Sequence, residues 1–137
     1  MKIEDLMTRE VEACTLLDNV YEAAVLMKEH NIGSVPIVDG SKLVGMITDR
    51  DIVIKGIAEK KPNSSRIQDL MSTNIITVTA DCTTDKALEI MKEHQIRRLP
   101  VVNGEHLIGM VSLGDLATKD SNNQIDETLE EISEQAH

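Results

Sequence analysis

Short apolar runs and helically spaced apolar residues alternate along this chain, and their order predicts its secondary structure. Two pairs of apolar runs are each joined by a dipeptide ending in glycine: residues 34–38 and 43–47 across Asp39-Gly40, and residues 99–102 and 107–111 across Asn103-Gly104. Asp-Gly and Asn-Gly between apolar runs are strong signals for a two-residue turn. The pattern therefore predicts two β-hairpins.

A predicted helix precedes each hairpin. Its apolar face spans residues 20–27 in the first half of the chain and residues 87–91 in the second. Side chains able to cap a helix stand at the start, Asp18 or Asn19 in one half and Thr83 or Thr84 in the other.

Extended segments are predicted before these helices, at residues 11–14 and 75–78. A further helix is predicted after each hairpin, from Thr48 or Ser112. Each half of the chain is thus expected to fold as β-α-β-β-α.

The two halves are copies of each other in an ungapped frame. Residues 3–53 align on residues 67–117 at a constant offset of 64 positions, and the tetrapeptide MKEH at residues 27–30 recurs at residues 91–94. Each copy alone is too short to bury much core. We therefore expect an α/β fold in which two pseudo-twofold-related motifs pack through their sheets.

Four segments follow from this repeat. Residues 1–56 form the first motif, residues 57–66 a polar linker, and residues 67–119 the second motif. In residues 120–137, Ile125, Leu129, Ile132 and Ala136 recur at helical spacing among acidic residues, which predicts an amphipathic C-terminal helix. Docking of this helix on its own domain and a dimer contact are both open alternatives.

The charge of the chain narrows its partners. Its 137 residues carry a formal net charge of −10 at pH 7, which argues against nucleic acid and against an anionic membrane surface. No apolar run reaches the length of a membrane span, and the N-terminus is acidic where a signal peptide would be basic. We expect a cytoplasmic protein.

Cysteine and histidine offer little chemistry. Cys14 and Cys82 stand outside any CxxC pattern and are interpreted as ordinary buried thiols. His30, His94 and His106 are dispersed without ligand spacing, so surface or capping roles are favoured over a metal site.

Two segments of the form [ST]-x-x-[DE] stand at the predicted strand-to-helix junctions, Thr48 to Asp51 and Ser112 to Asp115. One interpretation is a capping box, in which the hydroxyl accepts from the backbone amide three residues on and the carboxylate reaches back. The other uses the same geometry, because a carboxylate in a first helical turn can bind the vicinal hydroxyls of a ribose. The two interpretations are compatible.

Arg97 and Arg98 are adjacent cations in an acidic chain. They form either surface salt bridges, worth about 0–1 kcal/mol, or a bidentate clamp for phosphate. The matching residues of the first copy, Gly33 and Ser34, carry no charge, so phosphate affinity is expected to depend on the second copy, with Arg50 a possible supplement.

These features together resemble the CBS motif, and the pair resembles a Bateman module of the small stand-alone bacterial type. The resemblance is carried by Asp-Leu-Met at the start of each copy, the helix ending in MKEH, the apolar strand with Pro36 or Pro100, the hairpin turn, and Gly-h-h-[ST]-x-x-Asp (h, an apolar residue) at the end. It covers nearly the whole chain except the C-terminal segment.

The resemblance implies a regulatory module that binds AMP, ADP or ATP in clefts between the motifs, without a catalytic cofactor, and that pairs into a homodimer. By position, Thr48, Asp51, Ser112 and Asp115 match the family's ribose-binding residues, and Arg97 and Arg98 match its phosphate contacts. The family's residues that flank the adenine match positions in the early extended segments: Val11, Ala13, Ile75, Ile76 and Thr77.

Other functions are weighed against this one. An enzyme is not expected, because the sequence lacks a nucleophile elbow, a P-loop and a Cys/His arrangement. A binder of S-adenosylmethionine or NADH, and a ligand-free dimeric scaffold in which both capping boxes are purely structural, stay open. The effector protein downstream is unknown.

Overall fold

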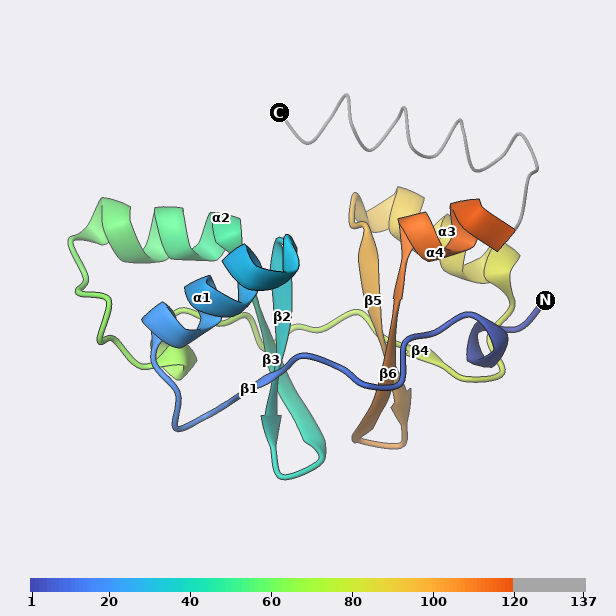
Figure 1. Ribbon diagram of the computed structural model, residues 1–137, viewed down its shortest axis with the longest axis horizontal. Coiled ribbons are helices and arrows are strands. Elements are labelled where there is room, and N and C mark those ends of the chain that lie inside the picture. Colours follow the sequence, from blue (N-terminus) through green and yellow to red (C-terminus); the bar gives the residue numbers. More distant parts are fainter. Residues whose placement is uncertain (120–137) are drawn as a thin grey trace. The chain divides into compact units, whose positions relative to one another are not determined.

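The computed structural model describes residues 1–119, and within this range both repeats share the order of a 3₁₀ turn, a strand, a helix, two strands and a helix (Figure 1). In the first repeat these are η1 (Ile3–Asp5), β1 (Cys14–Thr15), α1 (Val20–His30), β2 (Ser34–Asp39), β3 (Lys42–Thr48), α2 (Asp49–Asp51), η2 (Ile52–Gly56) and η3 (Ile57–Glu59). In the second they are η4 (Ile67–Asp69), β4 (Val78–Thr79), α3 (Thr84–His94), β5 (Arg98–Asn103), β6 (His106–Ser112) and α4 (Leu113–Lys119).

The α/β class and the order β-α-β-β-α are confirmed in both repeats. The early strands are the exception in extent, since β1 and β4 are two residues long and begin only at Cys14 and Val78. The predicted C-terminal helix lies outside the described residues.

Local chemistry explains where the long helices begin and end. Asn19 caps α1, accepting from the Glu22 amide at 3.1 Å, and Thr83 caps α3, accepting from the Lys86 amide at 3.2 Å. Asn31 and Gln95 follow the two helices in the left-handed conformation, at φ 52° and 58°. This geometry ends a helix by turning the chain out of its axis.

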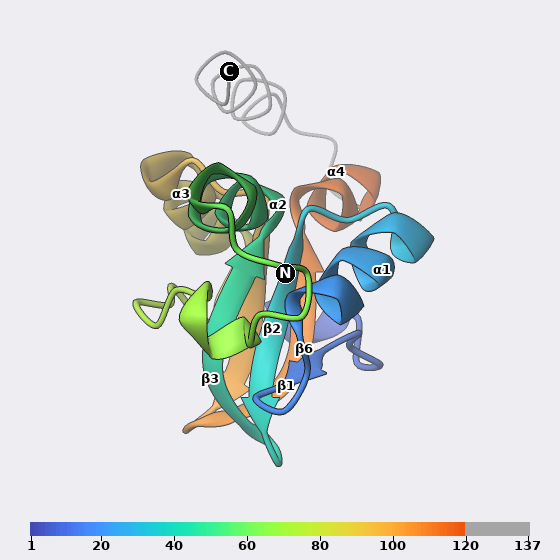
Figure 2. The same ribbon diagram turned by 90° about the vertical axis from the view of Figure 1, so that its left-hand side faces the viewer.

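The hairpins form at the predicted turns. β2 and β3 pair antiparallel from Ser34 opposite Thr48 to Asp39 opposite Lys42. Gly40 and Gly104 adopt φ of +64° and +63°, a conformation that glycine tolerates and other residues rarely adopt. Figure 2 faces the first of these hairpins, with α1 and α2 near the end opposite its turn.

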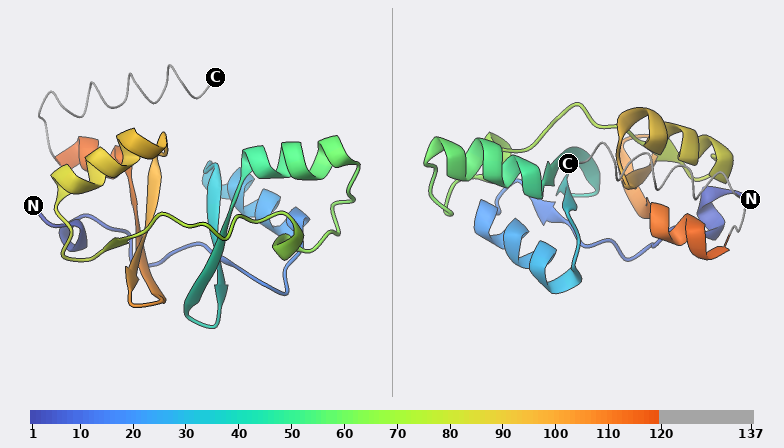
Figure 3. Two further views of the ribbon diagram at one scale, coloured as in Figure 1. Left: turned by 180° about the vertical axis from the view of Figure 1, so that it is seen from behind. Right: turned by 90° about the horizontal axis from the view of Figure 1, so that it is seen from above.

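The described residues divide into two compact units, named here by their long helices. The α1 unit contains Glu12–Ile75 and Glu105–Leu107, and the α3 unit contains Met1–Val11, Ile76–Gly104 and the described residues from Ile108 onward. In the α3 unit, α3 and α4 lie side by side (Figure 3).

The segment that opens each repeat, called here its lead-in, belongs to the unit of the other repeat. The lead-in of the first repeat is residues 1–11, in the α3 unit, and that of the second is residues 67–75, in the α1 unit. Ile3, Leu6 and Met7 are buried in the core of the α3 unit, and Ile67 and Leu70 are buried in the core of the α1 unit. The backbones of Thr8 and Met110 exchange two hydrogen bonds of 2.8 and 2.9 Å, and those of Ser72 and Met46 do the same at 2.8 and 2.9 Å. The lead-ins are therefore exchanged between the repeats.

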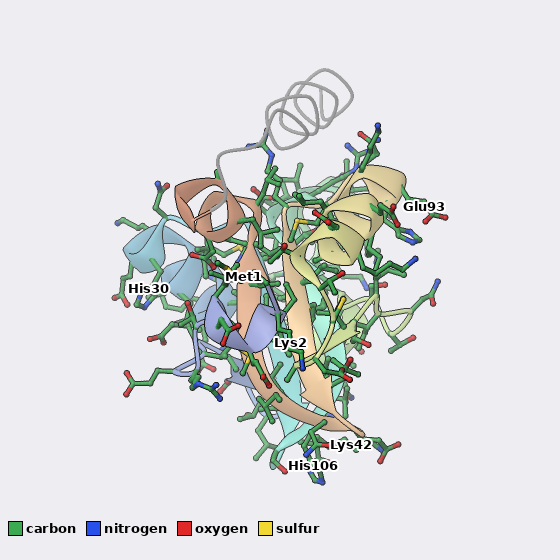
Figure 4. All side chains as sticks on the ribbon, turned by 90° about the vertical axis from the view of Figure 1, so that its right-hand side faces the viewer. Met1, Lys2, His30, Lys42, Glu93 and His106 are labelled. Atoms are coloured by element: carbon green, nitrogen blue, oxygen red, sulfur yellow. The ribbon has the colours of Figure 1, made fainter. Side chains whose placement is uncertain are left out.

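The hydrogen-bonded strand order is β1-β2-β3-β6-β5-β4. β1 runs parallel to β2, and β4 runs parallel to β5. The link between β3 and β6 is the pair Lys42 and His106, whose side chains Figure 4 labels, and both residues belong to the α1 unit. The Ser41 hydroxyl and His106 Nδ1 are 2.6 Å apart, so His106 makes a hydrogen bond at the protein surface.

Among the described residues, none of the helices combines the length and the apolarity needed to span a membrane.

Candidate functional site

Both predicted capping boxes are present. In the α3 unit, the Ser112 amide donates to Asp115 Oδ2 at 2.9 Å, and the Asp115 amide donates to Ser112 Oγ at 3.0 Å. In the α1 unit, Thr48 and Asp51 make the same two bonds at 2.9 and 3.0 Å. The capping interpretation is confirmed, and it fixes both carboxylates in half-buried positions in the first turn of a helix. Ribose binding by these residues stays a prediction.

The arginine pair is joined to the Ser112–Asp115 box by the backbone. The amide of Leu113, the first residue of α4, donates to the Arg97 carbonyl at 2.8 Å. Arg98 then begins β5, where successive side chains point to opposite faces. Arg97 is exposed and Arg98 is half-buried, and the Asp115 carboxylate lies close enough to Arg98 to act on the pKa of its guanidinium.

The charge state of Arg98 reflects two opposing effects. Burial lowers the pKa of its guanidinium below the usual range, and the negative Asp115 carboxylate raises it in opposition. Arginine stays protonated at any physiological pH. Arg98 is therefore a partly desolvated cation beside a pre-oriented acid, an arrangement able to meet an anion and a hydroxyl pair on one molecule.

The corresponding place in the α1 unit has a different charge. Here the Asp49 amide donates to the Gly33 carbonyl at 2.9 Å, in the same geometry as Leu113 and Arg97. The Asp49 carboxylate lies over Gly33, with Oδ2 only 3.1 Å from where a Cβ of residue 33 would stand. A carboxylate thus stands in the α1 unit beside the position that is an arginine in the α3 unit.

Lys55 makes a further difference between the two acids. Its ammonium lies 3.2 Å from Asp51 Oδ1, while Asp51 Oδ2 accepts from the Thr48 amide, so both carboxylate oxygens are engaged. Lys55 Nζ also donates to the Leu70 carbonyl at 3.4 Å. A ribose at Asp51 would compete with Lys55.

Sequence reasoning missed Asp49 and Lys55. The i,i+4 spacing of Asp51 and Lys55 is a signal that could have found the ion pair. The position of Asp49 over Gly33 has no local signal, because it depends on how the start of β2 meets the start of α2.

The two segments predicted to flank the adenine contain half-buried residues, and each segment has residues in both units. Ile76 and Thr77 belong to the α3 unit with Asp115, and Ala13 belongs to the α1 unit with Asp51. Val11 falls in the α3 unit and Ile75 in the α1 unit. The structure brings Arg97, Arg98, Ser112 and Asp115 together, and the role of the residues predicted to flank the adenine stays a prediction.

A pocket of about 320 Å³ lies elsewhere, along α1. It is lined by Cys14, Asp18, Tyr21, Glu22, Val25 and Leu26. None of the predicted site residues lines it, so it does not bear on the capping boxes.

Metal-ligating residues do not cluster in the part of the chain that the structure describes. No group of three or more His, Cys, Asp or Glu side chains there could hold a metal ion. His30 Nε2 lies 3.6 Å from a Glu12 carboxylate oxygen, an exposed pair.

A family model described as CBS domain matches this chain twice, over residues 3–56 and residues 67–122. The chain is 49% identical over 136 residues to the uncharacterized protein YlbB of Bacillus subtilis (strain 168), covering 97% of this chain and 92% of YlbB. It is 40% identical over 115 residues to Hypoxic response protein 1 of Mycobacterium tuberculosis (strain ATCC 25618 / H37Rv), covering 82% and 80% of the two chains.

Solved structures are also similar to this chain over most of its length. The crystal structure of Hypoxic Response Protein I, with two coordinated zinc ions, is similar at a TM-score of 0.80 and 38% identity, over 88% of this chain and 99% of that one. The CBS domain pair of protein MJ0100, in complex with 5-methylthioadenosine and S-adenosyl-L-methionine, is similar at a TM-score of 0.75 and 31% identity, over 86% and 94%.

Proposed function

This chain belongs to the CBS domain family as a tandem pair of motifs, and from that premise we propose that it is a regulatory module that binds an adenine nucleotide of the AMP, ADP or ATP type. The observation that carries the proposal is that the half-buried Arg98 guanidinium and the oriented Asp115 carboxylate belong to one unit and interact electrostatically. The adenosyl ligands in the similar MJ0100 structure support the ligand class. The proposal includes a homodimer in the cytoplasm that catalyses no turnover of its ligand.

In the proposed site, different residues bind the ribose, the phosphate and the adenine of the ligand. Asp115 accepts from the ribose hydroxyls, with Ser112 holding its orientation, and Arg98 binds phosphate, with Arg97 as an outer cation. Ile76 and Thr77 of the same unit flank the adenine. A charge-assisted hydrogen bond is worth about 1.5–3 kcal/mol, so each contact contributes roughly ten- to a hundredfold in affinity.

A thermal-shift panel of AMP, ADP, ATP, adenosine, S-adenosylmethionine and NADH tests the function. A ligand that binds only the folded state at a hundredfold excess over its Kd stabilises that state by about 2.7 kcal/mol. We expect AMP, ADP or ATP to raise the melting temperature. If no compound does so, the ligand-free scaffold is the better account.

Variants then test the site by isothermal titration. Arg98→Ala should weaken AMP binding at least tenfold and leave adenosine binding nearly unchanged, because adenosine has no phosphate. Asp115→Asn should weaken both ligands, because both carry the ribose hydroxyls. Arg98→Lys, which keeps the charge and loses the bidentate geometry, is the matched control and should fall between.

The double variant of Asp115→Ala and Arg98→Ala should abolish nucleotide binding in the α3 unit, and Asp51→Ala should have a smaller effect. Equal affinity of the wild type and the double variant would remove the assignment of these residues.

A second ligand class is favoured at the Thr48–Asp51 box alone. There the Asp49 carboxylate lies over Gly33, and this negative charge disfavours a phosphate. We propose that this box, if occupied, takes an adenosyl ligand without phosphate, such as S-adenosylmethionine. Asp49→Asn should then raise the affinity of AMP relative to that of S-adenosylmethionine.

A further inference from the structure

The pocket of about 320 Å³ in the α1 unit lies where the chain passes from β1 into α1 (Figure 1). The side chains that line it all belong to this unit: Cys14, Asp18, Tyr21, Glu22, Val25 and Leu26. Pockets that bind small molecules have volumes of about 300–1,000 Å³, so this one has room for a small ligand. We name it the α1 pocket.

Part of the α1 pocket is an apolar surface that is partly open to water. Tyr21 is 56% exposed, and Val25 and Leu26 are half-buried. Cys14 is 1% exposed and belongs to the core of the α1 unit, so the pocket reaches down to that core. An aromatic ring left half in water beside aliphatic side chains favours contact with an apolar molecule.

Two carboxyl groups meet in the same pocket. Asp18 Oδ2 accepts from the Thr15 amide at 2.8 Å. Glu22 Oε2 accepts from the Asn19 amide at 3.3 Å, so a backbone donor holds each group in place. The two carboxyl groups are also hydrogen-bonded to each other, which raises the pKa of Glu22 above its usual range. Such a bond needs a proton, and an N–H of an organic cation can take the place of that proton.

The second repeat does not keep this combination of residues. At the offset of 64 positions, the pocket residues Asp18, Tyr21, Glu22 and Val25 correspond to Cys82, Asp85, Lys86 and Glu89. Because α1 and α3 are both helices of 11 residues, the helix itself requires neither set. An apolar surface next to two acids is therefore specific to the first repeat.

We propose that the α1 pocket binds a small organic cation with an apolar body, such as an aromatic or alkyl amine. The ammonium group lies between the Asp18 and Glu22 carboxylates, and the apolar body packs on Tyr21, Val25 and Leu26. None of the side chains that line the pocket is a Lys or Arg that would compete for the two acids. The formal net charge of −10 also attracts a cation. The site is independent of the proposed nucleotide site, whose residues do not line the pocket.

Titration of the full chain with phenethylamine, followed by NMR of the backbone amides, tests the α1 pocket. We expect the amides of residues 14–26 to shift, with a Kd in roughly the millimolar range because the probe is small. Phenethyl alcohol has the same number of heavy atoms and no charge, so it should bind at least tenfold more weakly. Hydrocinnamate, an anion with a similar apolar body, should not bind.

Variants of the pocket separate the two acids from the apolar surface. Glu22→Gln removes one charge and keeps an acceptor for the Asn19 amide, so it should weaken phenethylamine at least tenfold. Tyr21→Ala should weaken phenethylamine and phenethyl alcohol alike. Glu29→Gln, which neutralises an exposed acid of α1 outside the pocket, is the matched control and should leave both affinities unchanged. A dispersed amide spectrum establishes that each variant is folded.

Three results would overturn this assignment. The first is equal affinity for phenethylamine and phenethyl alcohol, which would leave the two acids without a role. The second is unchanged binding of phenethylamine by Glu22→Gln. The third is no binding by the wild type, and a doubled mass that Tyr21→Asp returns to that of one chain would then assign the pocket to a second copy. AMP binding should be the same in Glu22→Gln and the wild type, so a failure here is distinct from a failure of the proposed function.

Discussion

At the residue scale, the equivalent carboxylates of the two repeats, Asp51 and Asp115, have different charged neighbours. Asp115 raises the pKa of the Arg98 guanidinium by its negative charge, whereas Asp51 is bound on one oxygen by the Lys55 ammonium. Asp49 adds a carboxylate over Gly33 where the second repeat has Leu113 beside Arg97. Two sites with equal capping geometry therefore differ in the charge that they offer a ligand.

Cys14 is a residue whose environment has a measurable consequence. Its side chain is buried in the core of the α1 unit, at 1% exposure. Burial, followed by the negative charges of Asp18 and Glu22, raises the pKa of the Cys14 thiol from 9.0 to about 12. Cys14 is therefore a protonated, unreactive thiol at neutral pH.

We predict that the free energy of unfolding falls as pH rises above about 9, the pKa of Cys14 in the unfolded chain. Between this pH and about 12, the unfolded thiol ionises and the folded thiol does not, so the unfolded state gains stability. The loss approaches about 1.4 kcal/mol per pH unit. Urea unfolding from pH 7 to pH 10.5 measures it.

Cys14→Ala should flatten this part of the profile, while Cys82→Ala should leave the contribution of Cys14 in place. Identical slopes for the wild type and Cys14→Ala would contradict the assignment.

At the element scale, a glycine in each hairpin allows the backbone of a lead-in to approach the hairpin closely. A Cβ at Gly45 of β3 would stand 2.5 Å from Met71 Sδ and 3.1 Å from the Ser72 carbonyl oxygen. A Cβ at Gly109 of β6 would stand 2.7 Å from Met7 Sδ and 3.0 Å from the Thr8 carbonyl oxygen. Glycine is needed here for close approach of two backbones.

Gly45→Ala and Gly109→Ala should each destabilise the protein by about 1–3 kcal/mol, because the methionine side chain can move but the carbonyl cannot. Gly114→Ala is the matched control. Its Cβ would meet nothing closer than Ser112 Oγ at 3.6 Å, and alanine favours a helix over glycine, so this variant should be neutral or more stable. Urea unfolding of the three variants decides; an equal loss in all three would contradict the close-approach argument.

At the scale of the whole molecule, the exchange of lead-ins makes the two repeats depend on each other. Ile3 is fully buried in the α3 unit, and its amide donates to the Cys82 carbonyl at 2.8 Å. Ile67 is fully buried in the α1 unit, and its amide donates to the Asp18 carbonyl at 3.3 Å. A repeat cut out as a contiguous segment loses part of its own core.

Ile3→Ala should therefore destabilise the α3 unit by about 2–5 kcal/mol, the usual cost of emptying a buried aliphatic site. Hydrogen exchange should locate the loss in α3 and β5, although residue 3 belongs to the first repeat. Glu10→Ala, at an exposed position of the same lead-in, is the control and should cost less than about 0.5 kcal/mol. Faster exchange in α1 instead of α3 after Ile3→Ala would refute the dependence.

The sequence alone determined the α/β class, the order of elements, the hairpin turns and both capping boxes. These features depend on residues within a few positions of one another: Gly104 reaches φ +63° inside its own turn, and Asp115 binds an amide three residues away. The repeat added the expectation of two related sites and of their unequal charge at Arg98 and Ser34.

Only the tertiary structure decided which lead-in joins which core, that Asp49 lies over Gly33, and that Arg98 is half-buried near Asp115. Ile3 and Ile67 have equivalent sequence surroundings, so periodicity cannot tell which core buries each of them. That choice follows from packing between residues far apart in the chain, where the fit of side chains against a distant backbone sets the free energy.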